Sequence, residues 1–401
     1  MKIKLQLLFL LGFFYTLTAE AQIVSHGINT LTSLQNKKTL QQVKFGSSSS
    51  TNFGNISQKV NINNLHTNLS LTFQSRETIS HDSSYLEYKT DHLTMGIGKI
   101  NRMWSFSPNT SLFLSNNARP TKSAYLKIDN ITLPFLRASS FEFFNSITRN
   151  QLGPKNAMLL GSRITFAPTK KLDLEFIKIS QWGGDGYSIG LPNFTAAILG
   201  NTNEGEFENI NQTAGFGLSY SFSGDLSPKR LYFQTLGEDQ AGGLPSCYIY
   251  LAGMDSQTSF SNIQTNFGFE IIDTRIDKTE HGNCGPNTAY NNGIYKYTNY
   301  DTVLGTSIDS EGKSIHLWSS FQISKQTNLK FSIQKVTIND NNWANHRLSS
   351  SKQDGRIITA LTKWQKGKLQ LKTELSHQSF NLDKANIKKG LNLGVFTSIR
   401  F

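Results

Sequence analysis

The polar residues that could do chemistry form few local groups in this chain. His281 and Cys284 have the spacing of two metal ligands, but the other cysteine, Cys247, lies far away in sequence. Glu238 and Asp239 are adjacent, so on a strand their carboxylates point to opposite faces and cannot act together on one atom. Neither group meets the requirements of a metal centre or of acid–base catalysis. We therefore expect no catalytic residues, no metal and no cofactor.

A phosphate-binding loop and a serine hydrolase are excluded in the same way. Gly312-Lys313-Ser314 resembles the end of a phosphate-binding loop, but Ser307 stands where the first glycine of that motif is required. The eight histidines form no local signature with serine of the kind that a nucleophile and its base produce. A hydrolase therefore remains only as a rival hypothesis.

The two cysteines exclude both a disulfide-built scaffold and a multi-cysteine metal protein. One strand-length segment, 262–272, lies between Cys247 and Cys284, and a hairpin there could bring the two thiols together. In an oxidising compartment a Cys247–Cys284 disulfide is the favoured interpretation. Metal binding by Cys284 and His281 is the weaker alternative.

The first residues have the organisation of a cleaved signal peptide. Lys2 and Lys4 precede an apolar run over 5–17, and Ala19-Glu20-Ala21 is a small-x-small cleavage pattern. The run is shorter than the roughly 20 residues that cross a bilayer as a helix, so an anchor is disfavoured. We expect a signal peptide at 1–21, a short periplasmic segment at 22–42, and a membrane domain at 43–401.

Alternation of apolar and polar residues with period two recurs along the rest of the chain. Ile315 and Leu317 fall on one face of a strand, and His316 and Trp318 fall on the other. Each segment of this kind has about the ten residues that cross a membrane when the strand is tilted. The same pattern occurs at 69–74, 216–222, 329–334, 369–376 and 391–401.

The connections between these segments indicate an antiparallel barrel. Sixteen to eighteen candidate strands can be placed in the chain, with no linker of the kind that separates soluble β-sandwiches. Short turns alternate with long polar loops, as in transmembrane barrels, and a closed sheet has no unpaired edge. We predict an all-β fold, a transmembrane antiparallel β-barrel. The short turns include 168–171, 324–328 and 365–367, and the long loops include 182–211, 273–309 and 337–355.

Several separate segments resemble one family, the outer-membrane capsule-assembly proteins of the Wzi type. The resemblance runs in order from about Trp104 to Asp309, roughly half the chain. It implies an eighteen-stranded barrel that acts as a lectin, holds exported capsular polysaccharide at the cell surface, and has no enzymatic activity. The segments that resemble the family are Ser115-Asn116-Asn117-Ala118-Arg119-Pro120, Gln181-Trp182-Gly183-Gly184-Asp185-Gly186, Asn211-Gln212-Thr213-Ala214-Gly215-Phe216, Gly237-Glu238-Asp239-Gln240 with the following 241–246, and 290–297.

One departure from the family concerns the N-terminus. The family carries an N-terminal helical bundle below the barrel, whereas here only residues 22–42 precede the first expected strand. Leu31 and Leu34 could form a brief helix but not a bundle. We therefore expect little N-terminal helical structure, and the departure puts a periplasmic plugging role of that kind in doubt.

Residues in the family-like segments provide candidate sugar contacts. Loop aromatic rings could stack on sugar rings, amides and carboxylates could bind hydroxyl groups, and an arginine could pair with a uronate or phosphate. The same residue types also form interfacial aromatic belts and simple turns, which is the alternative role for each of them. The candidates are Asn116, Asn117, Arg119, Trp182, Asp185, Glu238, Asp239 and Tyr295.

The sequence thus favours an exported outer-membrane barrel that binds capsular or exopolysaccharide and helps attach or assemble it. A general porin or small-solute channel is the main alternative. The formal net charge of +12 suits an acidic polymer or a phosphate-rich leaflet, and equally an anion-selective pore. Expected partners are the polysaccharide, outer-membrane lipid and lipopolysaccharide, and the barrel-assembly machinery, with no nucleic acid; the protein is expected to be a monomer.

Overall fold

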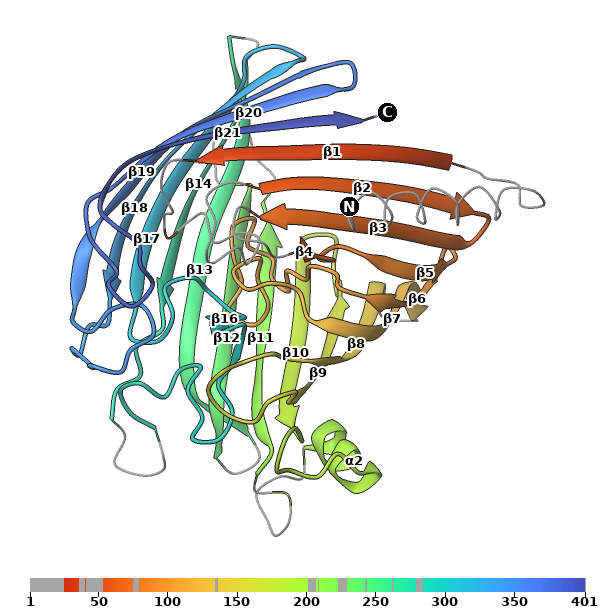
Figure 1. Ribbon diagram of the computed structural model, residues 1–401, viewed down its shortest axis with the longest axis vertical. Helices are drawn as coiled ribbons and strands as arrows, with labels where there is room; N and C mark the ends of the chain where they lie inside the picture. Colours follow the sequence, from red (N-terminus) through yellow and green to blue (C-terminus); the bar gives the residue numbers. More distant parts are fainter. Residues whose placement is uncertain are drawn as a thin grey trace, which may run out of the picture.

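A computed structural model shows a β-barrel with long loops at one end (Figure 1). It describes residues 25–35, 40, 53–74, 79–133, 136–200, 207, 209–222, 229–241, 244–261, 263–278 and 284–400. Within the described strands, the side chains at 25–35, 53, 74, 132–133, 136–138, 239–241, 244 and 260 are not described. Residues 1–21 lie outside the described residues, so the signal peptide stays a prediction.

Eighteen of the described strands form one closed antiparallel sheet, as the sequence predicted. Each strand pairs with the next along the chain, and β1 (Ser25–Gln35) pairs with both β2 (Phe53–Ile62) and β21 (Gly390–Arg400), which closes the ring. The short strand β4 (Ile79–Ser80) pairs with β3 alone, and β15 (Thr298–Asn299) pairs with β16 (Thr302–Val303) in a separate ladder. The other strands of the ring are β3 (Leu65–Gln74), β5 (Tyr85–Lys89), β6 (Leu93–Gly98), β7 (Lys122–Leu133), β8 (Leu136–Ile147), β9 (Met158–Phe166), β10 (Leu172–Trp182), β11 (Asn211–Ser221), β12 (Arg230–Ala241), β13 (Leu244–Phe260), β14 (Ile263–Asp273), β17 (Lys313–Gln322), β18 (Thr327–Ile338), β19 (Gln353–Lys366) and β20 (Leu369–Gln378).

The first strand corrects the prediction for the N-terminal segment. The barrel was expected to begin at residue 43, after a periplasmic segment at 22–42, but β1 already lies in the barrel wall. Leu31 and Leu34 have opposite parity on a strand, so the local pattern shows no clean apolar face. The strand forms because β2 and β21 supply hydrogen-bonding partners on both sides, and local periodicity does not report those partners.

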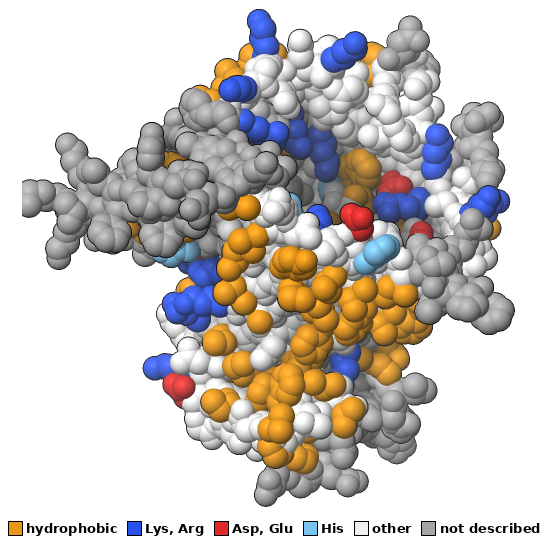
Figure 2. All heavy atoms as spheres, turned by 90° about the vertical axis from the view of Figure 1, so that its right-hand side faces the viewer, with side chains coloured by type: hydrophobic (Ala, Val, Ile, Leu, Met, Phe, Trp, Pro, Cys, Tyr) orange, Lys and Arg blue, Asp and Glu red, His pale blue; other side chains and the backbone are white. Residues whose placement is uncertain are grey.

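Large apolar side chains cover the outside of the barrel. Leu317, Phe331 and Ile358 are 48–50% exposed, although they lie in the middle of long strands. Figure 2 shows hydrophobic side chains gathered over a broad area of one face of the molecule. An apolar surface this large belongs against lipid, and it is the outward half of the alternation that the sequence displays.

The two ends of the barrel differ in the length of their connections. At one end, here called the turn end, strands are joined by short turns such as the two residues between β2 and β3 or between β19 and β20. At the other, the loop end, residues 99–121, 183–210, 274–312 and 339–352 connect the strands. In outer-membrane barrels the short turns face the periplasm and the long loops face the exterior.

One described loop contains a helix, α2 (Leu191–Leu199), which lies outside the ring near β10 (Figure 1). Gly190 is its N-cap, a proline lies in its first turn, and its C-cap is Gly200, whose φ of 91° is the left-handed conformation. Ala196 and Ala197 are its buried residues. Across the described part of the chain, no helix has the length and apolarity required to span a membrane.

Candidate functional site

Residues 99–121, between β6 and β7, run across the inside of the barrel and are here called the plug. The side chain of Gln234, on β12, binds the backbone of the plug. Its amide oxygen accepts from the Leu112 N–H at 2.8 Å, and its amide nitrogen donates to the Trp104 carbonyl at 2.7 Å. Its amide also donates to the Glu175 carboxylate of β10 at 2.9 Å. Because a buried amide with all these partners tolerates little movement, this contact fixes the plug against one wall.

The plug also contacts other parts of the wall. The Trp104 indole N–H donates to Glu142 of β8 at 3.0 Å, and the Ser107 hydroxyl donates to Glu270 of β14. Trp104 packs edge-on against Phe144, with ring centroids 5.3 Å apart. Contacts with β8 and β14 fix the plug across the lumen, and its apolar residues form part of the largest buried cluster of the described chain.

A second segment, residues 284–312, covers the plug on the loop side and is here called the platform. The hydroxyl groups of Tyr290 and Tyr297 donate to the plug carbonyls of Leu112 and Phe113 at 2.8 and 3.0 Å. The two tyrosine rings stack with an interplanar angle of 13°. Gly305 permits this approach, because a Cβ atom there would lie 2.3 Å from the Leu112 carbonyl oxygen. The plug and the platform therefore form one packed unit that fills the loop end of the lumen.

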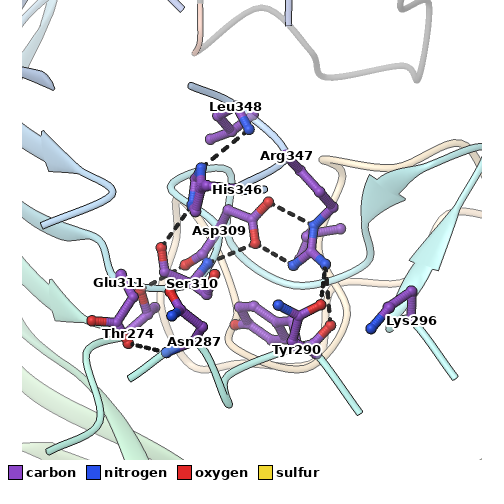
Figure 3. Close-up of polar contacts among 12 residues, drawn as sticks. Thr274, Asn287, Tyr290, Lys296, Asp309, Ser310, Glu311, His346, Arg347 and Leu348 are labelled. Atoms are coloured by element: carbon purple, nitrogen blue, oxygen red, sulfur yellow. Dashed lines mark hydrogen bonds and ion pairs between the residues drawn. The ribbon is translucent and has the colours of Figure 1, made fainter. Parts of the chain in front are cut away.

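An ion pair at the centre of the platform ties it to the loop 339–352 (Figure 3). Arg347 donates to both carboxylate oxygens of Asp309, and its Nε lies 2.8 Å from Oδ2. It also donates to the Asn291 amide oxygen at 2.9 Å. The Asp309 side chain is 3% exposed and that of Arg347 is 14% exposed. Burial alone would raise the pKa of the Asp309 carboxyl, but the Arg347 guanidinium outweighs burial and holds this pKa below its ordinary value.

His346 completes this cluster as a structural residue (Figure 3). Its Nδ1 accepts from the Leu348 N–H at 3.2 Å, so its Nε2 carries the proton and donates to the Ser310 carbonyl at 3.0 Å. The ring is 1% exposed. A buried imidazole with both nitrogens engaged is not available as a catalytic base.

Two further links hold the platform to the barrel wall. Glu238 of β12 accepts from the Tyr290 N–H at 2.6 Å, and a disulfide joins Cys247 of β13 to Cys284 at the start of the platform. The favoured cysteine pairing is thus present in the structure. Among the described residues, no three His, Cys, Asp or Glu side chains gather where they could bind a metal ion.

The structure corrects the expectation that Trp182 and Tyr295 offer ring faces to sugar. Trp182 is 3% and Tyr295 is 1% exposed, and the Tyr295 hydroxyl donates to the Gly183 carbonyl at 2.9 Å. Gly183 and Gly184 both have positive φ, at 59° and 94°, so the segment 183–186 forms a turn. The hydrogen bond from Tyr295 stabilises this turn. Neither ring can stack on a ligand because each is covered by protein.

The remaining candidates separate into buried and accessible residues. Glu238 is 8% exposed and is occupied by the platform, so it is a positioning residue. The side chain of Asp239 is not described. Asn116 and Asp185 are exposed on the loop side, and they remain candidate contacts.

Asn117 and Arg119 lie beside Asn116 and are partly covered. The Asn117 amide donates to the Val303 carbonyl at 2.8 Å, which joins the plug to the platform. Arg119 donates from Nε to Asp82 at 2.8 Å and lies over the Tyr300 ring at 4.5 Å from its centroid. The Arg119 side chain is 15% exposed, and its ion pair with Asp82 and its contact with the Tyr300 ring fix its orientation.

Sequence reasoning missed two residues that hold the plug and the platform in place. Gln234 and Arg347 were not singled out, because a glutamine on a strand and an arginine in a polar loop have no distinctive local pattern. Their partners lie more than thirty residues away in the chain, and local periodicity predicts no contact between residues so far apart in sequence. The motif 115–120 lies in the plug, where Asn117 joins it to the platform; its role in sugar binding stays a prediction.

Comparisons with known proteins agree with the fold. A crystal structure of the Escherichia coli outer-membrane protein Wzi, described as a carbohydrate-binding β-barrel involved in group 1 capsule assembly, superposes with a TM-score of 0.79 and 18% identity, covering 93% of this chain and 84% of that one. The outer-membrane protein OprD of Pseudomonas aeruginosa superposes with a TM-score of 0.53 and 9% identity over 96% of this chain and 95% of that one. At these identities the likeness concerns the fold alone.

Sequence comparisons identify the family. An uncharacterized 55.8 kDa protein in the cps region of Klebsiella pneumoniae is 34% identical over 124 residues, which is 30% of this chain. The chain spans only 25% of the length of that relative in this match. The family model of the capsule assembly protein Wzi matches residues 33–391, which is most of the chain. This protein therefore belongs to the Wzi capsule assembly family.

Proposed function

We propose that this protein is an outer-membrane barrel that binds exported capsular polysaccharide or exopolysaccharide and helps attach or assemble it at the cell surface. Its family membership supports this function, since the family is described by capsule assembly. The observation that carries the proposal is the filled loop end of the lumen. A barrel whose external mouth is packed with buried tyrosines and a disulfide-linked platform is suited to presenting a surface, and not to passing solutes.

The sugar-binding surface is proposed to lie on the exposed face of the loops. Asn116 and Asp185 are exposed there, and Arg119 beside Tyr300 supplies a cation next to an aromatic ring. Amide and carboxylate groups pair with sugar hydroxyls, and the arginine pairs with an acidic substituent. We propose binding without turnover; His346 of the loop 339–352 is consistent with this, because both of its ring nitrogens are engaged.

The function is tested by comparing cell-bound with released polysaccharide in cells that lack the gene. Loss of the protein is expected to move polysaccharide from the cell-bound to the released fraction, and the wild-type gene to restore it. Unchanged retention together with reduced solute uptake would contradict the proposal and favour a channel.

The surface is tested with paired variants in the same cells. Asn116→Ala combined with Asp185→Ala is expected to reduce retention several-fold while leaving barrel folding intact, because both side chains are exposed. Asn341→Ala is the matched control, an exposed loop residue that contacts Asn287 and is not among the proposed sugar contacts. Equal retention by all three proteins would remove these two residues from the binding surface.

A further inference from the structure

A cavity of about 830 Å³ occupies the turn end of the lumen, below the plug. Its wall is formed by residues close to the short turns, such as Ser221, Asn266 and Gln370. Pro108 and Asn109 of the plug also line it, so the cavity ends at the underside of the plug. This volume lies within the range of about 300–1,000 Å³ that is typical of small-ligand pockets.

The charge of the cavity wall is strongly positive. Carboxylates offset part of this charge: Arg230 forms an ion pair with Asp255, Lys372 forms one with Glu374 at 3.0 Å, and Lys330 interacts electrostatically with Glu270 of β14. The upper part of Figure 2 shows a hollow with Lys and Arg side chains on its wall. Even after these pairs are counted, the cations are in excess. The charged residues that line the cavity are Lys229, Arg230, Lys330, Lys363, Lys372 and one carboxylate, Asp255.

Two of the lysines lie against aromatic rings. The Lys330 ammonium is 5.2 Å from the ring centroid of Trp318, and the Lys372 ammonium is 4.5 Å from that of Phe396. The Trp318 indole lies flat against the facing Gly268. Only glycine leaves room for it there, because a Cβ atom at this position would come within 2.5 Å of the indole. Each pair therefore combines a cation with a flat aromatic ring. The cation can bind the carboxylate of a charged sugar, and the ring can contact the sugar ring.

We propose that this turn-end cavity binds a short segment of an acidic oligosaccharide, with sugar carboxylates on the lysines and sugar rings against Trp318 and Phe396. This inference rests on the function proposed above, because it takes the ligand to be a sugar. It places a second binding site on the periplasmic side of the plug, separate from the loop surface. The same barrel would then contact the polymer on both sides of the plug.

The site is tested by calorimetric titration of the purified full-length protein in detergent with trigalacturonate, and with maltotriose as the neutral probe. Trigalacturonate is expected to bind with an affinity that falls as salt is added, and maltotriose to bind much more weakly. Lys363→Gln combined with Lys372→Gln is expected to weaken trigalacturonate binding about tenfold, because two charge-assisted contacts are removed.

Lys366→Gln is the matched control, since Lys366 lies on β19 with Lys363 but on the opposite face. Thermal unfolding of each variant checks that the barrel is intact. The proposal is overturned if maltotriose binds as tightly as trigalacturonate, if inorganic phosphate binds as tightly, or if the double variant binds like the wild type.

Failure of this site is distinguishable from failure of the proposed function. If trigalacturonate binding follows the expected pattern but cells lacking the gene retain their polysaccharide, the cavity stands and capsule attachment fails. If retention depends on the protein but the titrations show no selective binding, the attachment function stands and the cavity proposal is wrong.

Discussion

The two ends of the barrel lumen have the same wall but different contents. At the loop end, the plug and the platform bury Leu112, Phe113 and Tyr290 completely, at 0% exposure. At the turn end, strands of the same sheet enclose a cavity of about 830 Å³ with five cations on its wall. The wall alone therefore does not determine whether such a barrel is open. The connections decide it, because only the long ones can fold back into the lumen.

The strongest test of this comparison is to remove the plug. Excision of residues 103–118, with a short Gly-Ser linker in their place, is expected to raise ion conductance in planar bilayers at least about tenfold, since barrels of 16–18 strands without an inserted segment hold an aqueous channel. Excision of 191–199, which removes only α2, is the control and should leave conductance low. A closed lumen after plug excision would mean that the platform alone fills it.

A second test breaks the ion pair that holds the platform. Arg347→Ala leaves the Asp309 carboxylate buried without its cation, and breaking a buried pair in this way costs about 3 kcal/mol. We expect lower resistance to urea in detergent, and faster proteolysis of the loop 339–352. Lys352→Ala is the control in the same loop, because its pair with Asp340 is exposed and should matter little. Equal loss in both variants would show that the buried pair has no special role.

The smallest expected effect is acid sensitivity of the loop end. The pKa of Asp309 in the folded protein lies below its ordinary value of 3.8, so its contribution to stability is present above that value and disappears as pH falls through the lowered pKa. The stability difference between the wild type and Asp309→Asn should therefore be constant from pH 7 to 5 and shrink below about pH 4. A difference that instead changes between pH 5 and 7 would assign the effect to another group.

The strands were predictable because the barrel wall is a two-sided surface. Leu317 faces lipid and Trp318 faces the lumen. Their odd and even positions on the strand are enough to place them on opposite faces, without knowledge of the neighbouring strands. Closure and the strand count also agree with the sequence prediction. The failures occurred where structure depends on distant partners. β1 is held by pairing with β2 and β21, and its local pattern is weak.

The binding candidates were harder to predict for a related reason. A loop tyrosine in a polar segment has the composition of a sugar-stacking residue, whether it faces solvent or folds inward. Tyr295 folds inward because the platform returns into the barrel and its hydroxyl finds the Gly183 carbonyl. Only the three-dimensional path of the loop distinguishes the two cases. Asn116 lies in a bend and Asp185 in a turn, and both are exposed.

The pairing of β1 with β21 has a consequence for how the barrel forms. These two strands are separated by nearly the whole chain, so their contact is among the last that synthesis makes available. Until then both edges of a growing sheet carry unpaired N–H and C=O groups, which invite aggregation. A protein of this design needs both edges of its sheet shielded until β1 and β21 pair.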